Sequence, residues 1–175
     1  MTETTKRTLV LLRHAKSDWP ADVPDHERPL ADRGRRAAPV MGRWLREEGY
    51  RPDHAMCSTA LRTRQTWELV GTELDADPPA EFEPRLYGAT VQDLLDVIAS
   101  APENAGTVLV IGHNPGIEHL ALTLTGDVPS VDRDRIRRKY PTAAAAVFEW
   151  PGGWDQVATG SARLVRFVTP RDLQS

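Results

Sequence analysis

The stretch TLVLLRHAKSDW, residues 8–19, runs from an apolar core segment directly into polar and charged side chains. Its four consecutive apolar residues, Leu9–Leu12, are typical of a short strand that is buried on both faces inside a parallel sheet. This strand ends in Arg13 and His14. Ligands of open parallel sheets bind outside the carboxyl ends of the strands, so the pair predicts a functional edge of the sheet.

Strand and helix patterns alternate along most of the chain beyond this stretch. The expected strands are short apolar runs, which lie at 9–12, 54–57, 107–111, 143–150 and 162–168. The expected helices carry apolar residues at helical spacing and cover 33–48, from 58 or 59 to about 74, from about 90 through 98, and from 114 to about 125. The alternation predicts an α/β fold with a largely parallel sheet, organised as one domain over residues 1–175.

Three helix starts have recognisable capping signals. Ser58 or Thr59 is expected to cap the second helix, and Thr90 with Asp93 is expected to form a capping arrangement for the third. Asn114-Pro115 is expected to cap the fourth helix and to place the proline in its first turn.

Composition narrows the class of protein. The chain has 175 residues, of which 40% are hydrophobic and 27% charged, and its formal net charge is −3. This balance argues against nucleic acid or an anionic membrane as a partner. The one cysteine, Cys57, excludes an intramolecular disulfide and a zinc knuckle. No apolar run approaches the roughly 18 residues of a membrane span, so we expect a cytoplasmic protein.

Polar residues follow three of the expected strands: Arg13-His14, the segment 58–62, and the segment 112–114. Taken singly, each has an ordinary explanation, such as a surface loop, a helix cap or an ion pair. Together they place two histidines and two arginines at like ends of parallel strands, without a carboxylate cluster for a metal. Guanidinium groups match phosphate geometry, and a neutral imidazole is a nucleophile, so the set predicts phosphoryl chemistry.

The sequence resembles the histidine phosphatase superfamily. The resemblance lies in LVLLRHAKSDW (9–19), RPLADRG (28–34), CSTALRTRQT (57–66) and VLVIGHNPGIE (108–118), and more weakly in LYGATVQDLL (86–95) and YPTAAAAVFEW (140–150). It implies a phosphoglycerate mutase-like fold, a three-layer α/β/α sandwich with a mostly parallel central sheet. The short chain without a large inserted cap looks most like the SixA-type phosphohistidine phosphatases.

The resemblance also implies roles for individual residues. His14 matches the histidine that becomes phosphorylated, Arg13 and Arg62 match arginines that hold the phosphoryl group, and His113 matches the second histidine of the pocket. Ser17 and Asn114 are expected to contact the substrate. No cofactor and no metal are implied, and the expected partner is a phosphorylated protein with a phosphohistidine domain or a small phosphorylated metabolite.

Several positions depart from the family pattern. Ala15 stands where glycine is common, and Pro20 stands where an asparagine often donates to phosphate. The acid that mutases and acid phosphatases use for the leaving group has no clear counterpart. Near its expected place are Tyr87 and Glu83, and a proton could also come from Asp18, Asp22 or Asp25. A missing acid favours a phosphoramidate such as phosphohistidine, because imidazole is a far better leaving group than an alkoxide.

Three alternatives stay open at this point. They are a small-molecule phosphomonoesterase of the same superfamily, a phosphoglycerate mutase, and a non-catalytic phosphate-binding module. The run DRDRIRRK at 132–139, within the charged segment 129–139, is expected to be an exposed connection rather than a site for nucleic acid or an acidic partner. The expectation for all five tryptophans is packing, although Trp19 and Trp154 lie in loops that could flank a pocket.

Overall fold

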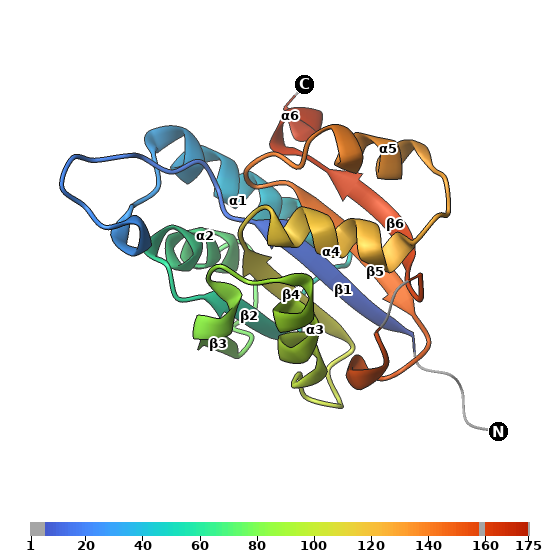
Figure 1. The fold of residues 1–175 in the computed structure, drawn as a ribbon. Helices are drawn as coiled ribbons and strands as arrows, with labels where there is room; N and C mark the ends of the chain where they lie inside the picture. Colours follow the sequence, from blue (N-terminus) through green and yellow to red (C-terminus); the bar gives the residue numbers. More distant parts are fainter. Residues whose placement is uncertain (1–5, 158–159, 175) are drawn as a thin grey trace.

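The computed structural model describes residues 6–157 and 160–174, whose strands form a six-stranded sheet in the order β3-β2-β4-β1-β5-β6 (Figure 1). The strands are β1 (Arg7–Arg13), β2 (His54–Ser58), β3 (Ala80–Glu83), β4 (Thr107–Gly112), β5 (Ala145–Trp150) and β6 (Arg163–Val168). The helices are α1 (Asp32–Glu47), α2 (Leu61–Gly71), α3 (Val91–Ala99), α4 (Gly116–Thr125), α5 (Val131–Arg138) and α6 (Pro170–Leu173). The first four strands in the sheet order are parallel, and β5 runs antiparallel to both of its neighbours. The predicted mostly parallel α/β sheet is therefore confirmed.

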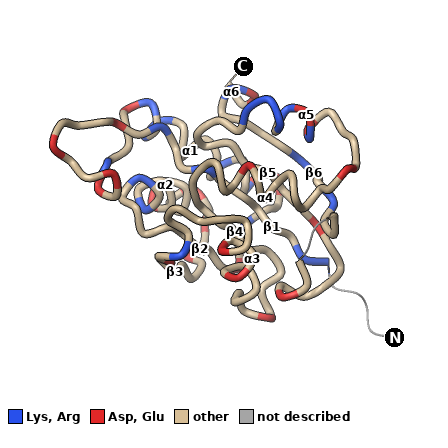
Figure 2. The backbone as a smooth tube through the Cα atoms, in the orientation of Figure 1, with Lys and Arg blue, Asp and Glu red and all other residues tan. Residues whose placement is uncertain are grey.

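Helices cover both faces of the sheet, as expected for a three-layer sandwich. In β1, Leu9 and Leu11 pack into a core cluster with α3, α4 and α5. Val10 and Leu12 pack into a second cluster with α1, α2 and α6. Each fully buried leucine or valine side chain is worth about 1.5–3 kcal/mol relative to exposure, so the two clusters fix β1 in the middle of the fold. Figure 2 shows that most charged residues lie on helices and loops, while the central strands β2 and β4 carry none.

The charged segment 129–139 is not an exposed connection, because it contains α5. Ser130 caps this helix, since its Oγ accepts the backbone N–H of Arg133 at 3.0 Å. Ile136 is completely buried, and Arg135 is paired with Asp172 at 2.5 Å. The helix has only two apolar residues, the exposed Val131 and the buried Ile136, and their spacing of five does not follow helical periodicity, which is why the sequence pattern did not predict the helix.

Two of the expected helix starts are also corrected. Neither Ser58 nor Thr59 caps α2, which begins at Leu61 after Ala60 without a side-chain cap and ends at Gly71. Asn114 does not cap α4, because the helix begins at Gly116 and its N-cap position is Pro115, without a side-chain cap.

Other local predictions have mixed outcomes. The capping box of Thr90 and Asp93 is confirmed at the start of α3, whereas the strand β3 was not predicted. Trp154 is buried, but Trp19 is 75% exposed, so the expectation of packing was wrong for Trp19. None of the described helices combines the length and apolar character that a membrane-spanning segment needs.

Candidate active site

The register of two central strands brings His14 and His113 together. β1 and β4 are parallel with Arg13 opposite Gly112, so each histidine follows its strand by one residue at the same edge of the sheet. The backbone N–H of His14 donates to the carbonyl oxygen of Gly112 at 3.0 Å, and the two imidazole rings are 5.3 Å apart between centroids. One phosphoryl group could therefore contact both rings.

A cavity of about 220 Å³, hereafter the His14 pocket, surrounds these rings. It is lined by Arg13, His14, Lys16, Ser17, Trp19, Arg28, Arg62, His113, Asn114 and Thr142. All six residues selected from the sequence thus line one pocket, although they come from three separate segments. Arg28, Lys16 and Thr142 were not selected, and Trp19 was named only as a loop residue that could flank a pocket.

His14 is held as a neutral ring with one free nitrogen. Its side chain is buried, and Nδ1 lies 2.8 Å from the carbonyl oxygen of Ala15, which can only accept a hydrogen bond. This contact assigns the ring hydrogen to Nδ1 and leaves the Nε2 lone pair available as a nucleophile. Burial, followed by the proximity of His113 and the positive charges of Arg62 and Arg13, lowers the pKa of His14 to about 3 against the effect of its hydrogen bond to Ala15. The ring is therefore uncharged at neutral pH.

His113 is likewise neutral and is oriented by the end of β2. Its Nε2 lies 2.8 Å from the Oγ of Ser58, the last residue of that strand. Burial and then the positive charge of Arg62 lower the pKa of His113 to about 4. The other ring nitrogen, Nδ1, is buried without a hydrogen-bond partner among the described residues.

Arg13 and Arg62 contribute the two predicted guanidinium groups. Arg13 donates through Nη1 to the carbonyl oxygen of Tyr140 at 2.9 Å. Arg62, in the first turn of α2, donates to the backbone oxygen of Asp25 at 2.7 Å and to its carboxylate at 3.1 Å. The Nε atoms of both arginines are buried and have no partner among the described residues, which leaves them as potential anion donors.

Arg28 is a third guanidinium group of the pocket. It is buried, and it donates to the Oγ of Ser17 at 2.6 Å, to the backbone oxygen of Asp18 and to the carboxylate of Asp25. Its guanidinium also lies over the exposed ring of Trp19. The segment 28–34 was recognised in the sequence, but the role of Arg28 depends on how the loop over 18–28 folds back, which no local pattern indicates.

The predicted substrate contacts Ser17 and Asn114 are both engaged with the protein. Ser17 accepts from Arg28, and the amide of Asn114 donates to the carbonyl oxygen of Tyr140 at 3.1 Å. The same carbonyl also binds Arg13, so Tyr140 positions two side chains of the pocket.

No carboxyl group is found among the described residues that line the His14 pocket. Asp25 lies beside it, where hydrogen bonds from Tyr87, Arg28 and Arg62 hold the pKa of its carboxyl well below the usual range. Glu83 is bound to Arg85, which lowers its pKa as well. Both carboxyl groups are ionised at neutral pH and are poor proton donors. Within residues 6–157 and 160–174, no three metal-ligating side chains are grouped as a metal site would require.

The fold and the pocket together define a class of α/β protein that presents histidines and arginines to a phosphoryl-type anion at the carboxyl edge of a parallel sheet. Residues 9–91 match the family model of the histidine phosphatase superfamily (branch 1). An uncharacterized protein of Mycobacterium tuberculosis is 42% identical over 162 residues, which cover 91% of this chain and 100% of the relative.

Two further relatives carry a functional name. The phosphohistidine phosphatase SixA of Escherichia coli is 31% identical over 124 residues, which cover 69% of this chain and 76% of SixA. A solved structure assigned to a SixA phosphohistidine phosphatase of Nakamurella multipartitia is 36% identical, with a TM-score of 0.85 and coverage of 94% of this chain and 96% of that one. The chain belongs to the histidine phosphatase superfamily and is a phosphatase of the SixA type.

Proposed function

We propose that this phosphatase hydrolyses phosphohistidine on proteins, with His14 as its nucleophile. The observation that carries the proposal is the composition of the His14 pocket, which has two neutral histidines and three arginines but no carboxyl group among its described lining residues. Such a pocket accepts a phosphoryl group and offers its leaving group no carboxylic acid. The similarity to proteins named phosphohistidine phosphatase supports the same substrate class.

The leaving group decides between substrate classes. A sugar phosphate must expel an alkoxide, for which a positioned general acid is worth about 10²–10⁴-fold in rate. A phosphohistidine expels imidazole, and its ring can already carry a proton on the nitrogen that is not phosphorylated. Loss of the phosphoryl group then leaves a neutral imidazole, so the enzyme needs no acid of its own.

In the first step, the lone pair on Nε2 of His14 forms a bond to phosphorus. The nitrogen–phosphorus bond of the substrate breaks, and its electron pair stays on the departing imidazole. Arg13 and Arg62 bind the equatorial oxygens, whose negative charge they stabilise. In the second step, water attacks phosphorus, the bond to His14 breaks, and Nε2 recovers its lone pair. The water proton leaves with the phosphate or passes to solvent.

His113 serves as a hydrogen-bond donor in this scheme. The Oγ of Ser58 accepts the backbone N–H of Ala60 at 3.3 Å, and its own hydrogen can point to Nε2 of His113. This arrangement places the ring hydrogen of His113 on Nδ1, which has no other partner among the described residues. Nδ1 would donate to a phosphoryl oxygen as charge develops on it.

The test is a comparison of kcat/KM for three substrates: a phosphotransfer domain phosphorylated on histidine, p-nitrophenyl phosphate and glucose 6-phosphate. We expect kcat/KM to be highest for the phosphohistidine domain, lower for p-nitrophenyl phosphate and lowest for glucose 6-phosphate. The aryl oxygen of p-nitrophenyl phosphate leaves more readily than the alkoxide of the sugar. His14→Ala, purified in parallel, excludes a contaminating phosphatase, and mass spectrometry of a rapidly quenched reaction should find the phosphoryl group on His14. Equal turnover of glucose 6-phosphate and phosphohistidine would show that an acid is present and would favour the small-molecule alternative.

A further inference from the structure

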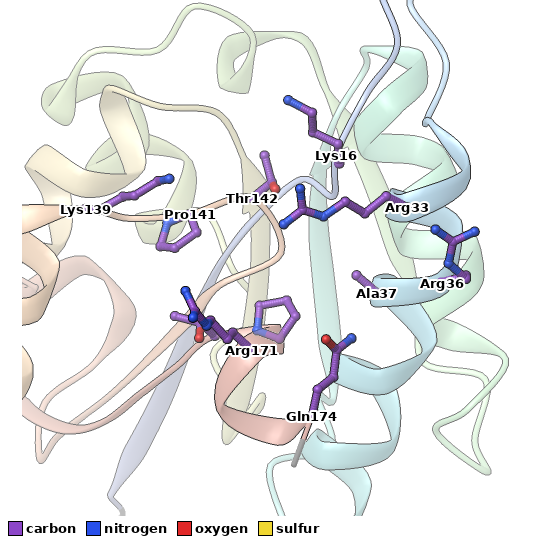
Figure 3. A pocket seen from close by; sticks show the side chains of 11 residues that line it. Lys16, Arg33, Arg36, Ala37, Lys139, Pro141, Thr142, Arg171 and Gln174 are labelled. Atoms are coloured by element: carbon purple, nitrogen blue, oxygen red, sulfur yellow. The ribbon is translucent and has the colours of Figure 1, made fainter.

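A second and larger cavity adjoins the His14 pocket (Figure 3). It has a volume of about 640 Å³, compared with about 220 Å³ for the His14 pocket. Lys16 and Thr142 line both cavities, so the two are adjacent. We call the larger cavity the basic pocket, after the five cationic residues in its lining: Lys16, Arg33, Arg36, Lys139 and Arg171.

The fold builds the basic pocket from four separate segments. Lys16 lies in the loop after β1, two of the arginines are in the first turns of α1, Lys139 follows α5, and Arg171 is on α6. Close packing fixes the first two segments, because a Cβ on Gly34 would lie only 2.1 Å from the backbone oxygen of Lys16. In Figure 3, Arg33 extends from α1 toward Thr142, at the side of the cavity shared with the His14 pocket.

The five cations of the basic pocket are not neutralised by their surroundings. None of them forms an ion pair or a side-chain hydrogen bond with another described residue, and the described lining contains no Asp or Glu. By contrast, the neighbouring Arg35 is paired with Asp32 at 3.4 Å, and Arg135 is paired with Asp172. The whole chain has a net charge of −3, so this is a local concentration of positive charge. Like charges at this density repel, and a bound anion would relieve the repulsion.

The chemistry of the lining favours the carboxylates of a protein over a small phosphorylated ligand. All five cationic residues are exposed, which suits contacts with the carboxylates of an acidic protein surface. The apolar part of the lining consists of Ala37 and two prolines, without an aromatic ring to stack on a nucleotide base. The His14 pocket has a volume of about 220 Å³, so a protein that presents its phosphoryl group there must keep most of its own surface outside the pocket.

We propose that the basic pocket binds acidic side chains that flank the phosphohistidine of the partner protein. The inference rests on the proposed function, since it takes a protein as the substrate. While the phosphoryl group occupies the His14 pocket, the neighbouring residues of the partner extend past Lys16 and Thr142, where their carboxylates meet Arg33, Arg36 and Arg171. The pocket then contributes to KM and to the choice of partner, and leaves the chemical step unchanged.

The test uses two fluorescent phosphohistidine peptides that differ in three flanking positions, which are Glu in one and Gln in the other. Anisotropy measures binding, and phosphate release measures turnover. At low salt we expect the Glu peptide to bind about tenfold more tightly than the Gln peptide, as several exposed ion pairs together would give, and the difference should shrink at high salt. Arg36→Glu should remove most of the preference and leave turnover of phosphoramidate, which has no flanking group, as in the wild type.

Arg35→Glu is the matched control. It lies on the same helix and changes the charge equally, but it is ion-paired and outside the pocket, so the preference should persist. Equal binding of the two peptides, or equal loss in both variants, would overturn the inference. A second contrary result would be that pyrophosphate inhibits the wild type but not Arg36→Glu while the two peptides bind equally. The basic pocket would then serve a small phosphorylated substrate. A binding preference for the Glu peptide without any turnover would refute the proposed function and leave the basic pocket standing.

Discussion

Lowering the pH from 7.5 to 5 should destabilise the folded protein through His14. In the fold the pKa of this histidine is lowered to about 3, whereas in the unfolded chain it titrates near the ordinary value of 6.5. Between these two values the unfolded state binds a proton that the folded state does not, so the free energy of unfolding falls as the pH falls. At pH 5 the two pKa values correspond to a loss of about 2 kcal/mol, which is a large share of a typical domain stability of about 5–15 kcal/mol.

Urea unfolding at pH 7.5 and pH 5, in buffers without phosphate, measures this loss. Phosphate is avoided because an anion bound among the arginines would add its own stabilisation. The free energy of unfolding should drop by about 2 kcal/mol more in the wild type than in His14→Gln, which has no titrating ring at this position. His119→Gln, which replaces an exposed histidine of α4, is the control and should show the wild-type drop. If wild type and His14→Gln lose equal stability, burial does not keep His14 neutral, and the argument for its nucleophilic Nε2 fails.

Three further perturbations test the site and its support. Removal of the nucleophile in His14→Ala should abolish turnover, whereas Arg62→Ala should lower kcat/KM by about 10²–10³-fold; equal, mild losses in both would show that the nucleophile lies elsewhere. Treatment with a chelator should leave turnover unchanged, and a loss that added magnesium restores would contradict the metal-free mechanism. Gly34→Ala should lower the melting temperature by several degrees, because its Cβ meets the backbone of Lys16 at 2.1 Å, and Gly71→Ala, with no contact under 3.8 Å, should not.

The polar residues at the strand ends were predictable from the sequence because parallel strands present their carboxyl ends at the same edge of a sheet. The apolar runs Leu9–Leu12 and Val108–Ile111 are both buried, which is typical of central strands in a parallel sheet, and the structure pairs them as neighbours. Whatever follows each run then falls at the same edge. The sequence therefore predicted that His14 and His113 lie close together, and in the structure their ring centroids are 5.3 Å apart.

The sequence patterns could not predict features that depend on the path of loops or on contacts between distant segments. Serine is a common helix-capping residue, yet the hydroxyl of Ser58 contacts His113 because β2 lies next to β4 in the sheet. Arg28 reaches the His14 pocket because its loop folds back onto Asp18. The basic pocket joins four segments that share no motif, so its cations could be counted in the sequence but not assembled.

Asp25 illustrates how one carboxylate can both build the site and limit its substrates. Arg28, Arg62 and Tyr87 all donate to it, so its negative charge orients two of the three arginines that line the His14 pocket. The same three donors stabilise the ionised carboxyl and hold its pKa well below the usual range, which removes it as a proton donor at neutral pH. If Asp25 were protonated to serve an alkoxide, it would lose the charge that holds the arginines in place. The arrangement therefore favours a leaving group that supplies its own proton, which is the property that distinguishes phosphohistidine from an alkyl phosphate.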